Sequence, residues 1–303
     1  MNKEVLVIIN PISGKGKSEK VYENSKDKLS NLYNLDEFIS KYPNHVNEYF
    51  LYNHKNIETK DLIIGIGGDG IIYEIINCLR KYNIQIPIAE IPAGSGNGYF
   101  KSITNENDKE NTIEEAISII ENYKVENVDL MKIKNLNLYS RLAISWGFIS
   151  DLDINTEWMR KLGSLRFDLC AIWNIIRKRT YSGRFTYYLE NDVSNTIEGN
   201  FVYFWACNVS HGSHDTLSAP GAKCNDSLIH ISYILDDVSR CELIKIILSL
   251  SSGKFIDHPK VVYISTSKFE LEIDSGMIVI DGEKINDKVI EVKNLHKELK
   301  ILV

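Results

Sequence analysis

Three glycine-rich segments in the first half of the chain carry the residue types that contact phosphate groups. They are Asn10 to Ser18 (NPISGKGKS), Gly65 to Gly70 (GIGGDG) and Ile91 to Gly98 (IPAGSGNG). Glycine lets the backbone approach an anion, successive N–H groups can line a nest, and a following helix adds partial positive charge. Each segment follows a β-rich run, where open parallel sheets bind their ligands. The three together predict a phosphate-binding site.

Two of these segments resemble other phosphate motifs in part. Gly16-Lys17-Ser18 ends like a Walker A loop, but Pro11 occupies the position of that motif's first glycine, so an ordinary P-loop is excluded. Gly65 to Gly70 fits the dinucleotide fingerprint, with Glu90 at about the right distance, roughly 20 residues on. However, Asp69 would place a carboxylate against the pyrophosphate. An acid inside a phosphate loop suits catalysis better, and dinucleotide binding remains an alternative.

The elements that must position these loops alternate between strand and helix patterns, which is typical of βαβ units with a parallel sheet. The expected strands of this half are Val5–Ile9, Asp36–Ser40, Leu62–Ile66 and Ile86–Ile91. The expected helices are Lys17–Ser30, Ile71–Tyr82 and a segment between Asn97 and Tyr123. The first domain is therefore assigned to residues 1–125.

After residue 125 the pattern becomes that of an antiparallel domain, assigned to residues 126–290, and residues 291–303 are expected to return to the first domain. The expected strands are Val128–Ile133, Leu138–Ser145, Arg184–Leu189, Phe201–Val209, Leu228–Leu235, Val261–Ser265, Phe269–Ile273 and Met277–Ile280. Helical patterns cover Ile154–Arg179 and Val238–Leu250. With no long linker, the two domains are expected to pack directly and leave a cleft as the ligand site.

Composition narrows the class of protein. The 303 residues are 44% hydrophobic and 25% charged, as in soluble globular proteins. The formal charge of −6 argues against nucleic acid as the main partner. The five cysteines form no Cys-x-x-Cys pair, no signal-peptide core follows Met1, and apolar runs are too short to cross a bilayer. We therefore expect a cytoplasmic protein whose membrane contact, if it has one, is peripheral.

The loops also carry a resemblance to a known family. Asn10-Pro11 with Ser13-Gly14, Gly67 to Gly70, and Pro92 to Asn97 resemble the three loops of the diacylglycerol kinase catalytic superfamily, which includes the sphingosine kinases. Further stretches are similar to consecutive stretches of sphingosine kinases: Ser145–Asp153, Arg160–Phe167, Arg179–Arg184 and Asp281–Glu283.

The resemblance implies an α/β nucleotide-binding domain followed by a β-sandwich lipid-binding domain, with ATP bound in the cleft between them. Asp69 inherits the role of general base on the lipid hydroxyl. Mg²⁺ is expected to be carried by ATP near Asp69, without a direct protein cage. The expected nucleotide contacts are Asn10, Ser13, Gly14, Ser40, Gly67, Gly68, Gly70, Ser95, Gly96, Asn97, Asp281, Gly282 and Glu283.

The second half supplies the expected lipid site. Arg160 and Arg166 match the family's two phosphate-facing arginines, where cations stabilise charge on the transferred group. Asp153 matches the acid that meets the amine of a sphingoid base. An apolar stripe fits either an ordinary core or an acyl-chain pocket: Leu165, Leu169, Ile172 and Trp173.

Two other features have competing readings. Arg177-Lys178-Arg179 fits either contact with anionic headgroups or a solvated helix end. His211 and His214 resemble a metal pair only superficially, because no partner ligands cluster with them in the sequence.

The predicted function is an ATP- and Mg²⁺-dependent kinase that phosphorylates a sphingoid base at its primary hydroxyl, with transient association at a membrane surface. The carboxylate of Asp153 favours a cationic sphingoid base over neutral diacylglycerol or ceramide. The alternatives are a diacylglycerol kinase or another lipid kinase of the same fold, and a non-catalytic lipid-binding relative.

Overall fold

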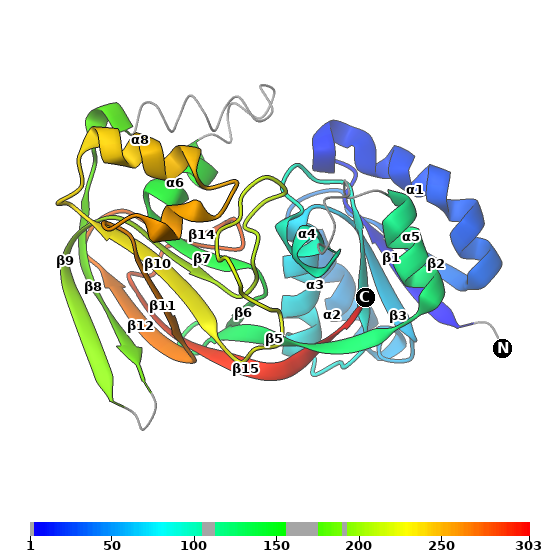
Figure 1. The fold of residues 1–303 in the computed structure, drawn as a ribbon. Helices are drawn as coiled ribbons and strands as arrows, with labels where there is room; N and C mark the ends of the chain where they lie inside the picture. Colours follow the sequence, from blue (N-terminus) through cyan, green and yellow to red (C-terminus); the bar gives the residue numbers. More distant parts are fainter. Residues whose placement is uncertain (1–2, 105–112, 156–174, 190–192) are drawn as a thin grey trace. The chain divides into compact units, whose positions relative to one another are not determined.

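The computed structural model describes residues 3–104, 113–155, 175–189 and 193–303. The chain divides into two compact units (Figure 1). Unit 1 comprises Met1–Val128 and Lys297–Val303, and unit 2 comprises Asp129–His296. Two strands, β5 (Val125–Ile133) and β15 (Val289–Leu302), have residues in both units.

Unit 1 is built on a parallel sheet with the order β4-β3-β1-β2, and the end of β15 pairs alongside β4 through Ile301 and Ile88. Its strands are β1 (Glu4–Ile9), β2 (Asn34–Ile39), β3 (Leu62–Gly67) and β4 (Ile88–Pro92). The central strand β3 and its neighbour β4 are buried along their whole length, as strands covered on both faces must be.

Helices cover both faces of this sheet. They are α1 (Ser13–Leu32), α2 (His45–Ile57), α3 (Asp69–Lys81), α4 (Gly98–Thr104) and α5 (Ile113–Asn122). Val5 and Val7 pack in one core with residues of α1 and α5. On the opposite face α3 lies so close to β3 that a Cβ at Gly65 would come within 2.3 Å of Ile72 Cδ1. The result is a three-layer α/β unit.

Unit 2 is an antiparallel β structure with the order β14-β13-β7-β9-β8-β12-β15, and β10 and β11 extend from β9. The remaining strands are β6 (Leu138–Ser140), β7 (Ala143–Gly147), β8 (Tyr181–Tyr188), β9 (Ser194–Cys207), β10 (Ile229–Leu235), β11 (Val262–Thr266), β12 (Lys268–Ile273), β13 (Ile278–Ile280) and β14 (Glu283–Ile285). Helical elements of the described residues accompany them: α6 (Phe148–Asn155), α8 (Arg240–Leu248) and the 3₁₀ helix η3 (Lys254–Asp257).

The expected fold class, α/β followed by an antiparallel β domain, is confirmed, but several element assignments were wrong. Helix α2 was not predicted, and neither were β14 and β15. Leu138–Ser145, expected as one strand, is two strands interrupted at Arg141 and Leu142. Helix α6 was not predicted over Phe148–Asp153, and most of the helix expected over Ile154–Arg179 lies outside the described residues.

These errors have local causes. Only Val46, Phe50 and Ile57 of α2 are buried, so its helical period is weak, and its tyrosines and phenylalanine favour strands. The segment expected as one helix after Asn97 contains α4 and α5, with residues 105–112 outside the described part. Among the described helices, none is both long and apolar enough to cross a bilayer.

An aromatic cluster forms the centre of unit 2. The ring of Phe185 is fully buried, and its centroid lies 5.0 Å from that of Tyr233 and 5.1 Å from that of Phe204. Trp146 packs nearby, 5.2 Å from Phe201. Aromatic rings in tilted and edge-to-face contact stabilise a core beyond the area they bury.

We expect Phe185→Ala to destabilise unit 2 by about 3–5 kcal/mol, because it leaves a cavity among these rings. All four tryptophans lie within residues 129–296, so tryptophan fluorescence during urea unfolding reports on unit 2. Leu248→Ala is the matched control, because this leucine is 77% exposed and should cost no more than about 0.5 kcal/mol. Equal losses in the two variants would contradict a central role for the aromatic cluster.

Candidate active site

The three predicted phosphate segments lie side by side at the carboxyl edge of the unit 1 sheet. Asn10 follows β1 and donates its backbone N–H to the carbonyl of Ile66 on β3 at 3.0 Å. Ala93 follows β4 and donates its N–H to the carbonyl of Gly67 at 2.7 Å. Parallel pairing of β1, β3 and β4 therefore brings together loops that are far apart in the sequence.

These loops touch through their backbones, and glycine is required at the contacts. A Cβ at Gly14, whose φ is +58°, would lie 2.0 Å from the carbonyl oxygen of Ala93. A Cβ at Gly94 would lie 2.4 Å from the Cα of Gly68. Real side chains do not make contacts this short, so the site depends on bare backbone at both places.

Polar groups also lie where the three loops meet, and we call this meeting place of Asn10–Ser18, Gly65–Gly70 and Ile91–Gly98 the cradle. A Cβ at Gly67 would lie 3.1 Å from Ser13 Oγ and 3.5 Å from Asn10 Cβ, so these three predicted contacts are neighbours. The side chain of Asn10 accepts a hydrogen bond from the N–H of Ile12 at 3.2 Å. Within the described part of the chain, no side chain caps the first turn of α1 or α3. Backbone N–H groups of the two first turns therefore favour an anion such as a phosphate.

Asp69 is the first residue of α3 and lies partly exposed at this cradle. Its Oδ2 accepts a hydrogen bond from the N–H of Gly98 at 3.2 Å, and its Oδ1 accepts one from the N–H of Tyr99 at 3.4 Å. The missing side chain of Gly96 leaves room, because a Cβ there would lie 3.2 Å from Asp69 Oδ2. The third loop thus orients the carboxylate that the second loop supplies.

Asn97 shapes the third loop with its side chain. Its Oδ1 accepts a hydrogen bond from the N–H of Gly94, and its Nδ2 donates to the carbonyl of the same residue, both at 3.1 Å. The backbone of Asn97 is left-handed, with φ of 49°, a conformation that asparagine tolerates better than most residues. The amide that was predicted to contact nucleotide is therefore used within the loop.

The remaining predicted contacts of unit 1 lie around the same edge. Ser40 follows β2, and its N–H donates to the carbonyl of Ile9 at 2.8 Å. No described atom lies within 4 Å of a Cβ built on Gly70, so the space beside it is open, and Ser95 is exposed. Glu90, the acid of the dinucleotide alternative, is buried inside β4 rather than at the loop edge.

Asp281, also predicted as a nucleotide contact, is a buried structural acid of unit 2. Its carboxylate accepts hydrogen bonds from Ser140 Oγ at 2.6 Å and from the backbone N–H groups of Arg141, Leu142 and Ala143 at 2.9–3.1 Å. Burial raises the pKa of this carboxyl, and the hydrogen bonds oppose that shift. These bonds explain why the strand predicted over Leu138–Ser145 is interrupted.

Gly282 and Glu283 complete the turn between β13 and β14. Both are exposed, and Gly282 adopts the left-handed conformation with φ of 87°. Glu283 is the first residue of β14. Of the predicted Asp281–Glu283 segment, the first residue anchors the turn and the other two face solvent.

The predicted lipid site lies largely outside the described residues. This holds for Arg160, Arg166, Leu165, Leu169, Ile172 and Trp173. Asp153 lies on α6, inside the helix rather than before it.

Two residues earlier on α6, Asp151 is an acid that the motif analysis missed. It is buried, accepts a hydrogen bond from the hydroxyl of Tyr181, and lies 3.8 Å from Arg179 Nη1. Nothing in the sequence distinguished Asp151 from Asp153, because the spacing of two acids on one short segment does not show which contacts either of them makes.

The histidine pair has no metal-site geometry in the described part of the chain, where no group of three or more His, Cys, Asp or Glu side chains could hold an ion. His211 is buried and shares a hydrogen bond with Ser210 at 2.9 Å between Nδ1 and Oγ.

Comparison with known proteins places this site in a family. Residues 4–133 match the diacylglycerol kinase catalytic domain, and residues 150–303 match the YegS C-terminal NAD kinase beta sandwich-like domain. Sphingosine kinase 2 of Arabidopsis thaliana is 30% identical, with 93% of this chain and 69% of the relative covered. The chain belongs to the sphingosine kinase family.

Other matches extend this result. Human sphingosine kinase 1 is 26% identical, with 95% of this kinase and 87% of the relative covered. A crystal structure of a putative diacylglycerol kinase from Bacillus anthracis has a TM-score of 0.78 at 19% identity, with 99% of this kinase and 95% of that chain covered, and shows a common fold. The protein is thus an ATP-dependent lipid kinase, with a β-sandwich as its second domain.

The close contact at Gly14 leads to a test of the kinase's cradle. We expect Gly14→Ala to lower the free energy of unfolding of unit 1 by about 2 kcal/mol or more. Alanine is strained at positive φ, and its Cβ would clash with the carbonyl oxygen of Ala93. Hydrogen exchange of the β1 and β3 amides measures this loss of stability. A fluorescent ATP analogue should bind at least about tenfold more weakly, a change that corresponds to roughly 1.4 kcal/mol.

Gly70→Ala is the control for stability. Gly70 lies in the first turn of α3 with open space around it, and alanine in a helix is favoured over glycine by up to about 1 kcal/mol. Unchanged protection and nucleotide affinity in Gly14→Ala would show that the loop contact is not required.

Proposed function

We propose that the chain transfers the γ-phosphate of ATP to the primary hydroxyl of a sphingoid base and releases its 1-phosphate. The observation that carries this proposal is a carboxylate, Asp69, oriented by backbone N–H groups beside three glycine-rich loops. Phosphoryl transfer needs an aligned hydroxyl and neutralised phosphate charge more than covalent help from the protein. The names of the sphingosine kinase relatives support the choice of acceptor.

In the proposed mechanism, Asp69 accepts the proton of the lipid hydroxyl. The hydroxyl oxygen bonds to the γ-phosphorus as the bond from that phosphorus to the β–γ bridging oxygen breaks, and ADP leaves. The hydrogen bonds from Gly98 and Tyr99 keep the carboxylate pointed at one place throughout. Orientation of this kind lowers the barrier because the base need not search for its proton.

The loops bind the phosphates in this proposal. Backbone N–H groups at the starts of α1 and α3 face the nucleotide, and Asn10 and Ser13 line the same wall. Arg160 and Arg166 are proposed to stabilise charge on the transferred group. Gly282 and Glu283 are proposed to contact the nucleotide from unit 2, whereas Asp281 holds their turn in place.

A divalent cation fits this site as a partner of the nucleotide. Asp69 offers the hard oxygen ligand that Mg²⁺ prefers, and within the described residues no cluster of three acidic, His or Cys side chains forms a separate cage. We propose that Mg²⁺ is held by the nucleotide phosphates next to Asp69 and supplies neutralisation of phosphate charge.

The acceptor is proposed to be a sphingoid base because of Asp153. A carboxylate attracts the ammonium group of sphingosine, whereas diacylglycerol and ceramide carry no such charge. The long alkyl chain of the acceptor also implies that the protein meets it at a membrane surface, as a cytoplasmic protein in transient peripheral contact.

We expect Asp69→Asn to lower kcat for sphingosine phosphorylation by about a thousandfold, because the amide cannot accept the proton. Radiolabelled γ-phosphate transfer from Mg-ATP measures the rate, and a fluorescent ATP analogue should still bind within about threefold, well under the roughly tenfold change that 1.4 kcal/mol would give. Circular dichroism checks that the fold is kept. A variant that retains more than about a tenth of the rate would exclude Asp69 as the general base.

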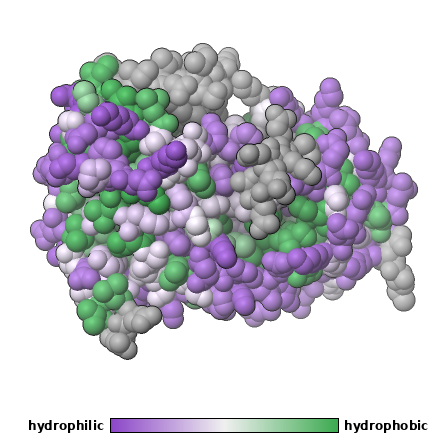
Figure 2. Space-filling view, viewed as in Figure 1, coloured by the Kyte–Doolittle hydropathy of each residue, from purple (hydrophilic) through white to green (hydrophobic). Residues whose placement is uncertain are grey.

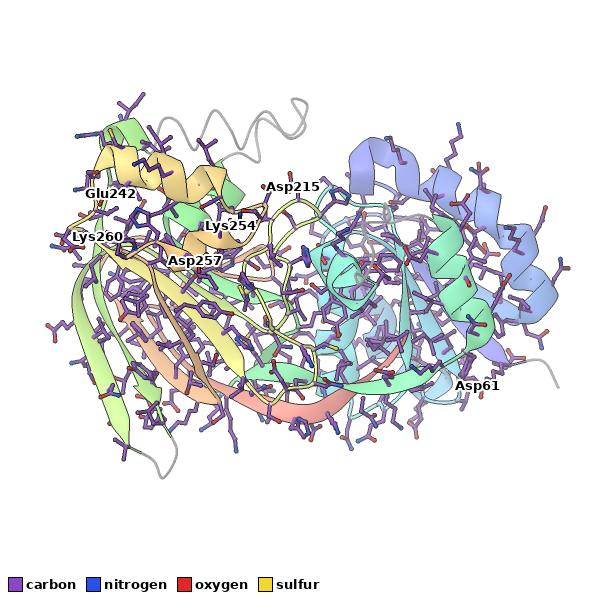
Figure 3. All side chains as sticks on the ribbon, in the orientation of Figure 1. Asp61, Asp215, Glu242, Lys254, Asp257 and Lys260 are labelled. Atoms are coloured by element: carbon purple, nitrogen blue, oxygen red, sulfur yellow. The ribbon has the colours of Figure 1, made fainter. Side chains whose placement is uncertain are left out.

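We expect Asp153→Ala to lower kcat/KM for sphingosine and dihydrosphingosine about ten- to a hundredfold, since hydrogen bonds between charged partners contribute roughly 1.5–3 kcal/mol. Turnover of ceramide, diacylglycerol and monoacylglycerol should not change. Asp257→Ala is the matched control, because it removes an exposed acid from the same unit (Figure 3).

The same panel separates the rival functions. Faster labelling of diacylglycerol, insensitive to Asp153→Ala, would keep the kinase chemistry and overturn the sphingoid substrate. Labelling of no lipid would favour a non-catalytic lipid-binding protein.

A further inference from the structure

The outward face of α8 carries apolar residues where a surface helix normally carries polar ones. Leu243 and Ile246 point into the core, as expected. On the opposite side, Ile244 is 44% exposed and Leu248 is 77% exposed. A spacing of four residues places these two side chains on one stripe of the helix.

A neighbouring segment exposes another apolar residue beside the start of α8. Ile175 packs in the same core cluster as residues of α8, while Ile176 is 58% exposed. The side chain of Arg240, at the start of α8, donates a hydrogen bond to the carbonyl of Ile176 at 3.0 Å. Figure 2 shows hydrophobic surface gathered at this corner of unit 2, over α8 and residues 175–178.

Cations surround these apolar residues, although the whole chain has a formal charge of −6. The exposed ones are Arg177, Arg179, Arg240 and Lys245. Of these four cations, Arg179 also lies 3.8 Å from the carboxylate of Asp151. Three acids nearby pair with groups outside this set. Glu242 closes the capping box of α8 and lies near Lys260 (Figure 3), and Asp237 pairs with Lys260 at 2.6 Å. The carboxylate of Asp236 accepts a hydrogen bond from Asn200, and Lys178 donates to the backbone carbonyl of the same residue.

We propose that this surface docks the kinase on an anionic lipid bilayer. We call it the α8 face and define it by Ile176, Ile244 and Leu248 with Arg177, Arg179, Arg240 and Lys245. Apolar side chains that enter the headgroup region, ringed by cations that pair with anionic lipids, are the features of an interfacial helix. The proposal rests on the proposed function only in that a long-chain acceptor is presented by a membrane.

Charge complementarity selects the bilayer as the occupant. The exposed apolar residues of α2 offer a contrast: Leu51 and Tyr52 share their helix with one acid, Glu48, and one lysine, Lys55, and Glu58 follows, so these apolar residues have no excess of cations around them. With three apolar side chains and four cations, we expect binding to the bilayer to be reversible and to depend on lipid charge. Permanent anchoring requires more buried hydrocarbon than this surface offers.

The test measures co-sedimentation of the intact protein with vesicles, without ATP or sphingosine. Phosphatidylcholine vesicles are compared with vesicles containing about one-third phosphatidylserine, at low and high salt. We expect binding to the anionic vesicles that weakens with salt. The double variant Ile244→Ser with Leu248→Ser should weaken binding to the anionic vesicles about tenfold. The double variant Arg177→Gln with Lys245→Gln should weaken it by a similar factor and should leave binding to neutral vesicles unchanged.

The matched control is Leu51→Ser with Lys55→Gln, which removes the same residue types from α2 and should bind vesicles like the original protein. Tryptophan fluorescence checks that unit 2 remains folded in the α8 variants. The proposal fails if the α8 variants bind vesicles unchanged, or if the α2 variant loses binding equally. It also fails if the α8 variants instead lose self-association by analytical ultracentrifugation while vesicle binding stays constant.

The docking proposal and the proposed function can fail separately. Phosphorylation of sphingosine in detergent micelles should be the same in the α8 variants and the original protein, because micelles deliver the acceptor without a bilayer. Vesicle binding that depends on the α8 face, with no lipid phosphorylated, would overturn the function and keep the docking surface. Normal phosphorylation with vesicle binding independent of the α8 face would do the reverse.

Discussion

The candidate site depends on direct contact between the backbones of three loops. Gly14 meets the carbonyl of Ala93, and Gly68 meets Gly94, at distances where no side chain fits. This contact fixes where the first turns of α1 and α3 point, and it places the amides of α4 against Asp69. The direction of the helix N-termini and the orientation of the Asp69 carboxylate are therefore two results of one packing constraint, imposed by parallel pairing of β1, β3 and β4.

In unit 2, one buried carboxylate accepts the backbone hydrogen bonds that a strand would otherwise give to its neighbour. Asp281 accepts hydrogen bonds from Ser140 and from three successive backbone N–H groups that would otherwise be unpaired. An unsatisfied buried N–H costs roughly 1–3 kcal/mol, so the acid makes the break between β6 and β7 possible. The turn that carries Gly282 and Glu283 is held from the same point.

The parts that could be predicted from the sequence were those encoded locally. Glycines, an acid and short polar side chains in fixed spacing marked the loops, and continuous apolar runs marked β1, β3 and β4. Helix α2 was missed because so few of its residues are buried that its period is faint. The hydrogen bonds of Asn97 and Asp281 could not be predicted. Those of Asn97 depend on the loop conformation, and those of Asp281 join residues about 140 positions apart in the chain. A motif shows that a residue type is needed, but it does not separate a ligand contact from a structural bond.

Burial separates these two uses of an acid better than sequence does. Asp281 and Asp129 are both nearly inaccessible, and each is surrounded by donors: Asp129 accepts from the N–H of Ser227 at 2.6 Å and pairs with His296 at 2.8 Å. Such a carboxylate serves the fold, because removing one donor would leave a buried acceptor atom with fewer hydrogen bonds than it needs. Asp69 differs in being partly exposed, and it accepts hydrogen bonds from backbone N–H groups at 3.2 and 3.4 Å. Those longer contacts orient the group while solvent can still reach it, which is the arrangement that the role proposed for Asp69 requires, because a general base gains and loses a proton in every turnover.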